Sequence, residues 1–380
     1  MKKSALLIIL LLCISIFLFG CGNTEKDTTI EEVTLEHSAE INVEESSNSL
    51  NTETVEAVDD LPPEEGMVRS KLTNEWVTPD VGVLRPLAVM IPNDKSALPQ
   101  YNISNADIIY ECLVEGELTR LMAIYGDWTN LERVGNIRSC RDYFVYWAFE
   151  WDAIYCHAGG PFYIDEVIGR FDTQNINALV APQGVFYRTS DRSAPQNLYL
   201  DGKAIWNEAD RLRYSLTPRD NYSDDVHFQF ASASKPNNFE EYGSDAVSAL
   251  KIDLAAAYPV TKTWFEYNES DGLYYRYQAP SDGAHMDAAT DSQLAFKNVL
   301  IQFTTHEQRD DNGYLAFQCI DTSKDGWYFT NGKGIHVNWK KTSDYGATRY
   351  YDDNGKEIML NTGKTMVCIV QNGDTFSYSN

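Results

Sequence analysis

The chain has 380 residues, enough for two domains, and its formal net charge is −25. This acidic balance argues against binding to nucleic acid and against docking on anionic lipid. No dinucleotide-binding, P-loop, HExxH or GxSxG motif occurs. The sequence therefore predicts no cofactor and no metal site, and it assigns no reaction.

The first 21 residues predict a lipoprotein signal peptide. Lys2 and Lys3 precede the apolar residues 5–19, and residues 18–21 (LFGC) resemble a bacterial lipobox. The resemblance implies that Cys21 becomes a lipidated N-terminus, which would anchor the protein to the cell membrane on its extracytoplasmic face. A plain transmembrane anchor is the alternative, because the apolar run is near the minimum length for a membrane span.

Residues 22–66 predict a disordered acidic linker. They contain fourteen Asp or Glu residues, one Lys and almost no aromatic residue. Such a segment cannot bury enough apolar surface to offset the entropy of ordering. We expect it to hold a folded head away from the membrane.

Residues 67–225 predict an N-terminal domain of mixed α and β structure. Its expected elements are a buried strand at 85–93, a hairpin at 106–125, a helix at 139–151, a buried strand ending at His157, and helices at 161–170 and 201–212. Residues 226–380 predict a second domain, mostly of antiparallel strands, because strand-like runs alternate there with Asp-Gly and Asn-Gly turns.

Five cysteines follow Cys21, and four of them lie in apolar, strand-like runs. Their number is odd and no CxxC motif occurs, so we expect buried free thiols. One disulfide, for example between Cys112 and Cys156, is the alternative.

Several segments together resemble the YerB-like family of bacterial lipoproteins. They are residues 85–93, 106–120, 134–141, 157–160 (HAGG) and 355–365. The resemblance covers nearly all of the head, from about residue 85 to 370. It implies an α+β fold with a three-layer β-β-α sandwich core and a mostly antiparallel β C-terminal module. It implies no activity, because the family has none assigned.

The choice of basic residue is the strongest indication of a binding site. Between residues 96 and 202 all seven basic residues are arginine: Arg120, Arg133, Arg138, Arg141, Arg170, Arg188 and Arg192. A guanidinium group can grip a phosphate or carboxylate in two places, whereas a lysine is a point charge. We therefore predict a groove for an anionic cell-envelope ligand. Its candidate residues are Arg120, Arg138, Arg141, His157, Gly159, Gly160, Arg188 and Arg192. Structural pairing of these arginines with nearby acids is the alternative.

Two other functions stay open from the sequence. One is an envelope hydrolase or transferase acting on a phosphorylated glycan, with Arg138, Arg141 and His157 at its site, although a histidine closing an apolar strand is commonly structural. Glu115 and Glu117 could serve a glycosidase, but turn carboxylates are commonly just solvated. The other function is a scaffold that docks a protein partner through the C-terminal module.

Overall fold

The computed structural model describes residues 61–220, 222 and 227–380 of the chain. The predicted signal peptide, the lipidation site Cys21 and residues 22–60 of the predicted linker lie outside the described residues. Residues 61–66, the end of that linker, are exposed.

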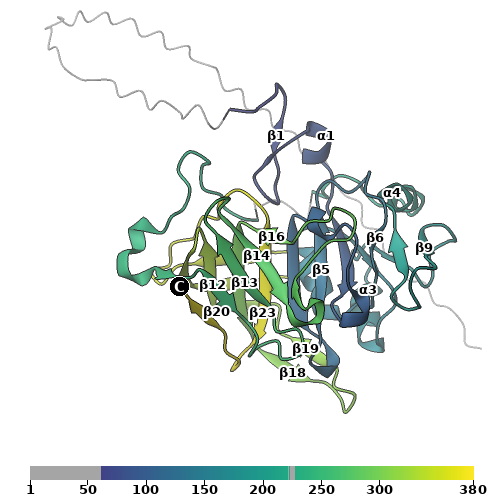
Figure 1. Cartoon of the computed structure of the whole chain (residues 1–380). Coiled ribbons are helices and arrows are strands. Elements are labelled where there is room, and N and C mark those ends of the chain that lie inside the picture. The colour runs from purple at the N-terminus through teal and green to yellow at the C-terminus, as the bar shows by residue number, and fades with distance from the viewer. Residues whose placement is uncertain (1–60, 221, 223–226) are drawn as a thin grey trace, which may run out of the picture. The chain divides into compact units, whose positions relative to one another are not determined.

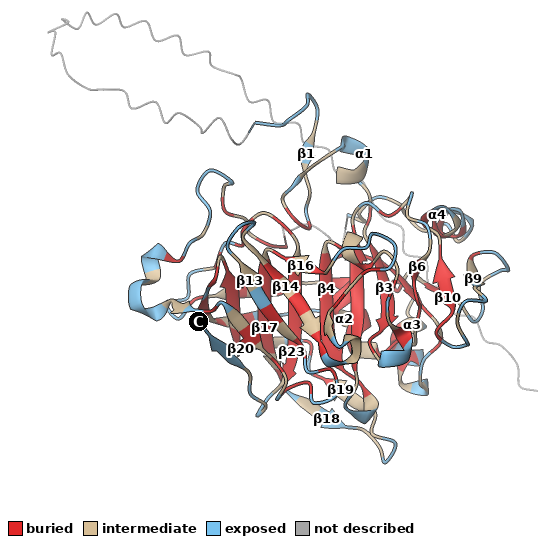
Figure 2. Cartoon of the chain, viewed as in Figure 1, coloured by how far each residue is buried: buried red, intermediate tan, exposed pale blue. Residues whose placement is uncertain are grey.

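A central sheet of eleven strands contains segments from both halves of the chain (Figure 1). Its strands are β3 (Leu87–Pro92), β4 (Ile108–Leu113), β5 (Thr119–Tyr125), β7 (Ile154–His157), β8 (Asn175–Asn177), β11 (Val247–Ser248), β17 (Asn298–Thr304), β20 (Asp321–Thr330), β21 (Lys333–Lys341), β22 (Arg349–Tyr351) and β23 (Thr365–Gln371). Their order is β11-β21-β20-β17-β23-β4-β5-β3-β7-β8, and β22 pairs with β21. The halves meet where β23 runs parallel to β4. β3, β4 and β5 are buried along their whole length (Figure 2), which explains their nearly continuous apolar sequence.

A second sheet packs on one face of the central sheet. Its six strands are β12 (Lys251–Asp253), β13 (Trp264–Asn268), β14 (Leu273–Gln278), β15 (Gly283–Ala284), β16 (Ala295–Phe296) and β24 (Ser377–Ser379), and their pairing is antiparallel throughout. The hydroxyl of Tyr258, in the turn before β13, donates to the carbonyls of Glu111 and Ile369 on the central sheet, at 3.1 and 2.9 Å. These two bonds help to hold the sheets together.

Helix α2 (Asp142–Phe149) covers the other face of the central sheet. Its Tyr143 hydroxyl donates to the carbonyl of Leu113 at 2.8 Å, and its Trp147 ring stacks on Tyr110. The remaining short helices are α1 (Pro79–Gly82), α3 (Asp165–Ile168) and α4 (Gly202–Arg211). Sheet, sheet and helix form the three layers of an α+β sandwich, which confirms the predicted fold class.

Two helices differ from the sequence prediction. The helix expected at 139–151 begins only at Asp142, because the preceding residues are extended and their N–H groups bond to neighbouring strands and loops. The Ile137, Arg138 and Cys140 amides donate to the carbonyls of Leu198, Met90 and Gly159. The helix expected at 161–170 is reduced to the 3-10 turn η5 (Phe162–Ile164) followed by α3.

Smaller elements complete the described chain. They are β1 (Val68–Arg69), β2 (Trp76–Val77), β6 (Val134–Gly135), β9 (Phe186–Arg188), β10 (Leu198–Leu200), β18 (His306–Gln308), β19 (Leu315–Phe317), η2 (Lys95–Ala97), η3 (Ile103–Asn105), η4 (Glu115–Glu117), η6 (Glu240–Asp245) and η7 (Ala279–Ser281).

The five cysteines of the head are buried and free. Cys112 and Cys156 lie on β4 and β7, with β5 and β3 between them. Three strand spacings of about 4.8 Å exceed the reach of a disulfide, so the alternative pairing does not form.

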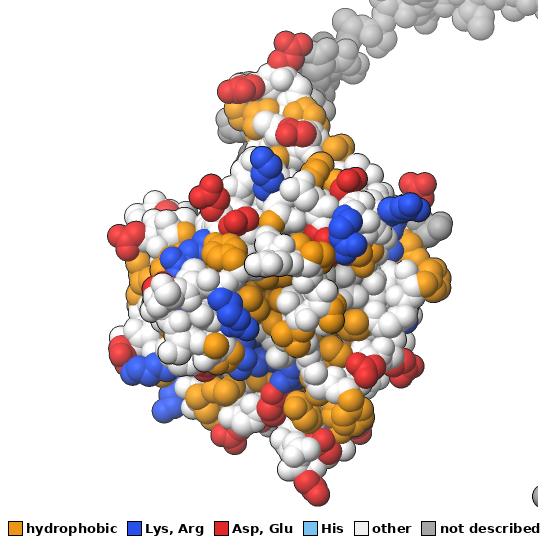
Figure 3. Space-filling model, turned by 90° about the vertical axis from the view of Figure 1, so that its right-hand side faces the viewer, with side chains coloured by type: hydrophobic (Ala, Val, Ile, Leu, Met, Phe, Trp, Pro, Cys, Tyr) orange, Lys and Arg blue, Asp and Glu red, His pale blue; other side chains and the backbone are white. Residues whose placement is uncertain are grey.

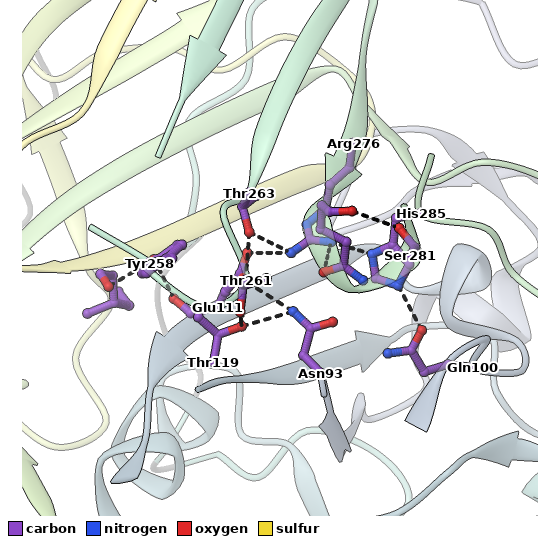
Figure 4. Close-up of polar contacts among 12 residues, drawn as sticks. Asn93, Gln100, Glu111, Thr119, Tyr258, Thr261, Thr263, Arg276, Ser281 and His285 are labelled. Atoms are coloured by element: carbon purple, nitrogen blue, oxygen red, sulfur yellow. Dashed lines mark hydrogen bonds and ion pairs between the residues drawn. The ribbon is translucent and has the colours of Figure 1, made fainter. Parts of the chain in front are cut away.

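A buried polar network joins the two sheets (Figure 4). Glu111 on β4 accepts from Arg276 Nη2 on β14 at 2.8 Å, and both side chains are completely buried. The other oxygen of Glu111 accepts from Thr119, Thr263 and Asn93 at 2.7, 3.0 and 3.2 Å. Every charge in this pair is therefore compensated, as a buried ion pair requires.

The network continues from Arg276 to a neutral histidine. Arg276 Nη1 donates to Gln278 Oε1 at 2.8 Å and to His285 Nδ1, while His285 Nε2 donates to Gln100 Oε1 at 2.7 Å. Burial, together with the charge of Arg276, holds the pKa of His285 well below its usual value. The neutral imidazole can therefore accept a hydrogen bond from Arg276 at its Nδ1.

We expect Arg276→Met to lower the free energy of unfolding by about 3–5 kcal/mol at pH 7, because it leaves the Glu111 carboxylate buried without its cation. Urea unfolding measures this loss. The double variant Glu111→Gln/Arg276→Met should lose less than the single variant, since no charge is then stranded. A double variant whose loss equals or exceeds that of the single variant would contradict the ion pair.

Candidate functional site

The β4–β5 hairpin sends its polar side chains to opposite faces of the central sheet. Thr119 lies opposite Leu113 in the strand register and shares a face with Glu111, so it joins the buried network. Arg120 lies opposite Cys112 and points to the face covered by α2. The neighbouring residues Thr119 and Arg120 therefore lie in two different environments.

Three arginines meet on the α2 side at one edge of the sheet, and we call Arg120, Arg138 and Arg141 the arginine cluster. Arg120 stands at the start of β5, and its Nη1 donates to the carbonyl of Ser139 at 2.9 Å. Arg138 and Arg141 flank Ser139 in the extended segment before α2. The charges of Arg141 and Arg138 both act on Arg120.

This edge collects the carboxyl ends of parallel strands. β3, β4, β7 and β8 all run in the same direction, since β3 and β4 are both antiparallel to β5, and β7 and β8 follow β3. The arginine cluster lies where β4 ends and β5 begins. Crevices at the carboxyl ends of strands are the usual ligand sites of open sheets with parallel strands.

Arg120 is a buried cation without a carboxylate of its own. Its side chain belongs to a residue that is only 7% exposed, and its Nε has no hydrogen-bond partner among the described residues. Burial, reinforced by the positive charges of Arg141 and Arg138 and offset by Glu115, lowers the pKa of Arg120 to about 10. An additional negative charge at this place would stabilise the cation.

Arg141 is paired with Glu115. Its Nε donates to Glu115 Oε2 at 2.9 Å and its Nη2 donates to Oε1, a bidentate contact. Burial acts to raise the pKa of Glu115, but the hydrogen bonds and charge of Arg141 outweigh it, and the pKa is lowered. The guanidinium also lies 5.4 Å from the ring centroid of Tyr314, which comes from the loop between β18 and β19.

Arg138 has its cationic side chain still available. It is half-buried, its Nε has no partner among the described residues, and no ion pair or side-chain hydrogen bond of Arg138 occurs within the described part of the chain. Its backbone is fixed, since its N–H donates to the carbonyl of Met90 at 2.9 Å and its carbonyl accepts from Ala158 N–H at 3.0 Å. The backbone is therefore held in place while the guanidinium remains free to take a ligand.

His157 and the two glycines shape the wall beside Arg138. His157 is completely buried; its Nδ1 donates to the carbonyl of Gly159 at 2.9 Å and its Nε2 lies 3.2 Å from the Asn175 side-chain oxygen. Burial lowers the pKa of His157. Gly159 has φ +63°, and a Cβ there would lie 2.5 Å from Leu179; a Cβ on Gly160 would lie 2.5 Å from Ile164. These residues allow two loops to approach closely, and they offer no accessible base.

The other arginines between residues 96 and 202, including Arg188 and Arg192 of the predicted groove, make different contacts. Arg188 on β9 donates to Asn197 Oδ1 at 2.7 Å and lines a cavity of about 210 Å³ together with Leu179 and Leu198. Arg192 donates to the carbonyls of Ala97 and Pro99 at 2.8 and 2.6 Å. Arg133 pairs with Asp191, and Arg170 pairs with Asp172 and Asp344. The structure thus brings Arg120, Arg138 and Arg141 together next to the His157–Gly160 turn. The guanidinium of Arg192 is occupied by hydrogen bonds to backbone carbonyls.

The face that carries β9 and α4 combines charge with apolar side chains. Figure 3 shows this face, where hydrophobic side chains line a hollow and Lys or Arg side chains lie at its margin. The loop between β18 and β19 contributes two residues next to the arginine cluster. Its Tyr314 lies near the guanidinium of Arg141, and its Arg309 pairs with Asp142. Sequence reasoning missed both, because nothing in that loop signals contact with residues about 170 positions earlier.

Comparisons with known proteins agree with this architecture. Two family models match the chain: "Protein of unknown function (DUF3048) N-terminal domain" over residues 72–215, and the corresponding C-terminal domain over residues 252–367. The chain belongs to this YerB-like family. A Bacillus subtilis relative named "Putative lipoprotein YerB" is 28% identical over 322 residues, which cover 84% of this chain and 92% of the relative.

A solved structure supports the fold. The crystal structure of Bacillus subtilis YerB superposes with a TM-score of 0.70 at 24% identity, covering 82% of this chain and 99% of that chain. Within residues 61–220, 222 and 227–380, no helix has the length and apolar character needed to cross a membrane.

We expect Glu115→Gln to destabilise the protein by about 1–2 kcal/mol at pH 7, because it removes the carboxylate that offsets Arg141 and Arg120. Since the pKa of Glu115 is lowered in the folded state, its contribution is complete above about pH 4.5 and is lost as the pH falls below the usual pKa of a glutamate. Urea unfolding should show a larger difference between the variant and the wild type at pH 7 than at pH 3.

The matched control is Glu117→Gln, which removes an exposed carboxylate two residues away. It should change the free energy of unfolding little at either pH. An equal loss for Glu115→Gln at both pH values would contradict a charge-based role.

Proposed function

We propose that this chain is a membrane lipoprotein, anchored through Cys21 on the extracytoplasmic face, whose head binds an anionic envelope ligand at the arginine cluster. The predicted lipobox and the name of the Bacillus subtilis relative support the lipid anchor. The acidic residues 22–66 support a role as a spacer between anchor and head. The ligand is an anion carrying phosphate, which planar guanidinium groups recognise well.

The observation that carries the binding proposal is the unmatched positive charge beside Arg120. Three guanidinium groups lie together, and the carboxylate of Glu115, whose charge also acts on Arg120, is engaged bidentately by Arg141. Arg138 and the Nε of Arg120 have no acceptor within the described part of the chain. Leaving buried donors unpaired costs about 1–3 kcal/mol each, and more for charged groups. An anion that bonds to Arg138 and lies near Arg120 would relieve this cost.

The geometry favours binding over an envelope hydrolase or transferase. That alternative needs His157 as an accessible base, but His157 is completely buried and both of its ring nitrogens face partners. Cys140, the thiol nearest the cluster in sequence, is also buried, and burial raises its pKa to about 12. Such a thiol is a poor nucleophile at neutral pH.

The docking-scaffold alternative has less support from the C-terminal module. The large hydrophobic side chains exposed after residue 227 are Leu250, Val260, Ile320, Met359 and Tyr378, each between 36% and 44% exposed. Single, partly exposed hydrophobic residues are normal on protein surfaces and do not mark an interface.

We expect Arg138→Gln to weaken binding of inorganic phosphate at least tenfold, because a hydrogen bond between charged groups contributes about 1.5–3 kcal/mol. Isothermal titration calorimetry at constant ionic strength measures the affinity. The fold should be unaffected, since the Arg138 side chain makes no bond within the described residues.

The charge-matched control is Lys356→Gln, which removes one cation. Lys356 pairs with Glu241 at an exposed place, and both residues lie in the C-terminal half of the chain, whereas the arginine cluster lies in the N-terminal half. Its phosphate affinity should stay within twofold of the wild-type value. Wild-type protein that binds no phosphate, or a folded Arg138→Gln variant with unchanged affinity, would contradict the proposal.

A further inference from the structure

The most exposed hydrophobic side chains of the head gather in one stretch of sequence. Phe162, Phe171, Leu179 and Val180 are 69%, 96%, 66% and 79% exposed, whereas the exposed hydrophobic residues elsewhere between residues 68 and 380 reach at most 57%. Phe162 begins η5, and the other three lie in the loops after α3 and β8, all of which follow the His157–Gly160 turn. Apolar surface of this kind is unfavourable in water unless a partner covers it.

Leu179 is connected to the arginine cluster through the glycine turn. Residues 158–160 run beside residues 138–140, since Ala158 N–H donates to the carbonyl of Arg138 and Cys140 N–H donates to the carbonyl of Gly159. Leu179 packs directly on Gly159, where a Cβ would lie 2.5 Å from its Cδ1. Leu179 also lines the cavity of about 210 Å³ that contains Arg188. Leu179 therefore places apolar surface close to Arg138.

Phe162 is connected to the cluster through a series of aromatic contacts. The ring centroids of Phe162 and Tyr163 lie 3.9 Å apart. The rings of Tyr163 and Tyr314 meet edge-on, with their centroids 5.7 Å apart. Tyr314 in turn lies against the guanidinium of Arg141. Leu179 and Phe162 are thus two exposed apolar side chains, and each is linked to the arginine cluster by its own series of contacts.

We infer that the anionic ligand is an amphiphile, a phosphate monoester carried on a hydrocarbon chain. This inference rests on the proposed function, because it takes the arginine cluster as the phosphate site. The phosphate bonds to Arg138 beside Arg120, and the hydrocarbon chain of the ligand covers Leu179, Val180 and Phe162. A phosphate-bearing glycan without a hydrocarbon chain would leave these side chains in water. The acidic balance of the whole chain disfavours binding to an anionic membrane surface, but it does not oppose capture of a single lipid phosphate by a local group of arginines.

The test compares octyl phosphate, ethyl phosphate and octyl glucoside by isothermal titration calorimetry, with the octyl compounds kept below the concentrations at which they form micelles. Wild-type protein should bind octyl phosphate at least tenfold more tightly than ethyl phosphate, because the longer chain removes apolar surface from water. It should show no measurable binding of octyl glucoside, which lacks the charge. Equal affinity for the two phosphates, or binding of octyl glucoside as tight as that of octyl phosphate, would overturn the inference.

Variants distinguish the contribution of the ligand's hydrocarbon chain from that of its phosphate group. Phe162→Ser/Leu179→Ser should abolish the tenfold preference and leave the affinity for ethyl phosphate within twofold, while Val83→Ser, at an exposed apolar residue far from the cluster in sequence, should keep the preference. A preference retained by the double variant would overturn the inference and leave the phosphate site intact. Arg138→Gln should weaken both phosphates equally; unchanged affinity for both would instead refute the proposed function itself.

Discussion

The alternation of side chains along the β4–β5 hairpin is the constraint on which both polar centres of the molecule depend. It directs Glu111 and Thr119 towards the second sheet, where Arg276 neutralises the carboxylate. It directs Arg120 to the opposite face, where two further arginines stand. A shift of the register by one residue would exchange the two environments and leave both charges unmatched. The closed network holds the sheets together, and the open cluster remains for a ligand.

The two centres differ in how their charge is compensated. The Glu111–Arg276 pair is completely buried, and its opposite charges compensate each other within a hydrogen-bonded network, so it stabilises one arrangement of the two sheets. The arginine cluster retains uncompensated positive charge in a chain whose formal net charge is −25. Proteins retain uncompensated charge of this kind mainly at functional sites, where a bound ligand supplies the missing interaction.

Much of the fold could be predicted from the sequence, because its strands have nearly continuous apolar runs and its turns carry Asn-Gly or Asp-Gly. The start of α2 could not, since the amides of residues 137–140 are bonded by strands and loops distant in sequence. The division into domains at residue 225 stays a prediction; residues 223–226 lie outside the described part, and the central sheet contains strands from both sides of that boundary.

The candidate site was only partly predictable. The bias towards arginine drew attention to residues 120–141, but it gave no means of separating Arg138, whose guanidinium is available, from Arg141 and Arg192, which bond to Glu115 and to backbone carbonyls. That difference depends on which acids and carbonyls the fold brings near each side chain. Leu179 and Tyr314 could not be assigned to the site either, because they reach it from distant loops.

The most direct measurement is an NMR titration of the arginine Nε–H resonances with inorganic phosphate at constant ionic strength. The account predicts that the resonances of Arg138 and Arg120 shift together and saturate with one dissociation constant, while those of Arg276 and Arg133 stay in place. Shifts that are equal over all arginines, or absent from Arg138 at saturating phosphate, would contradict it.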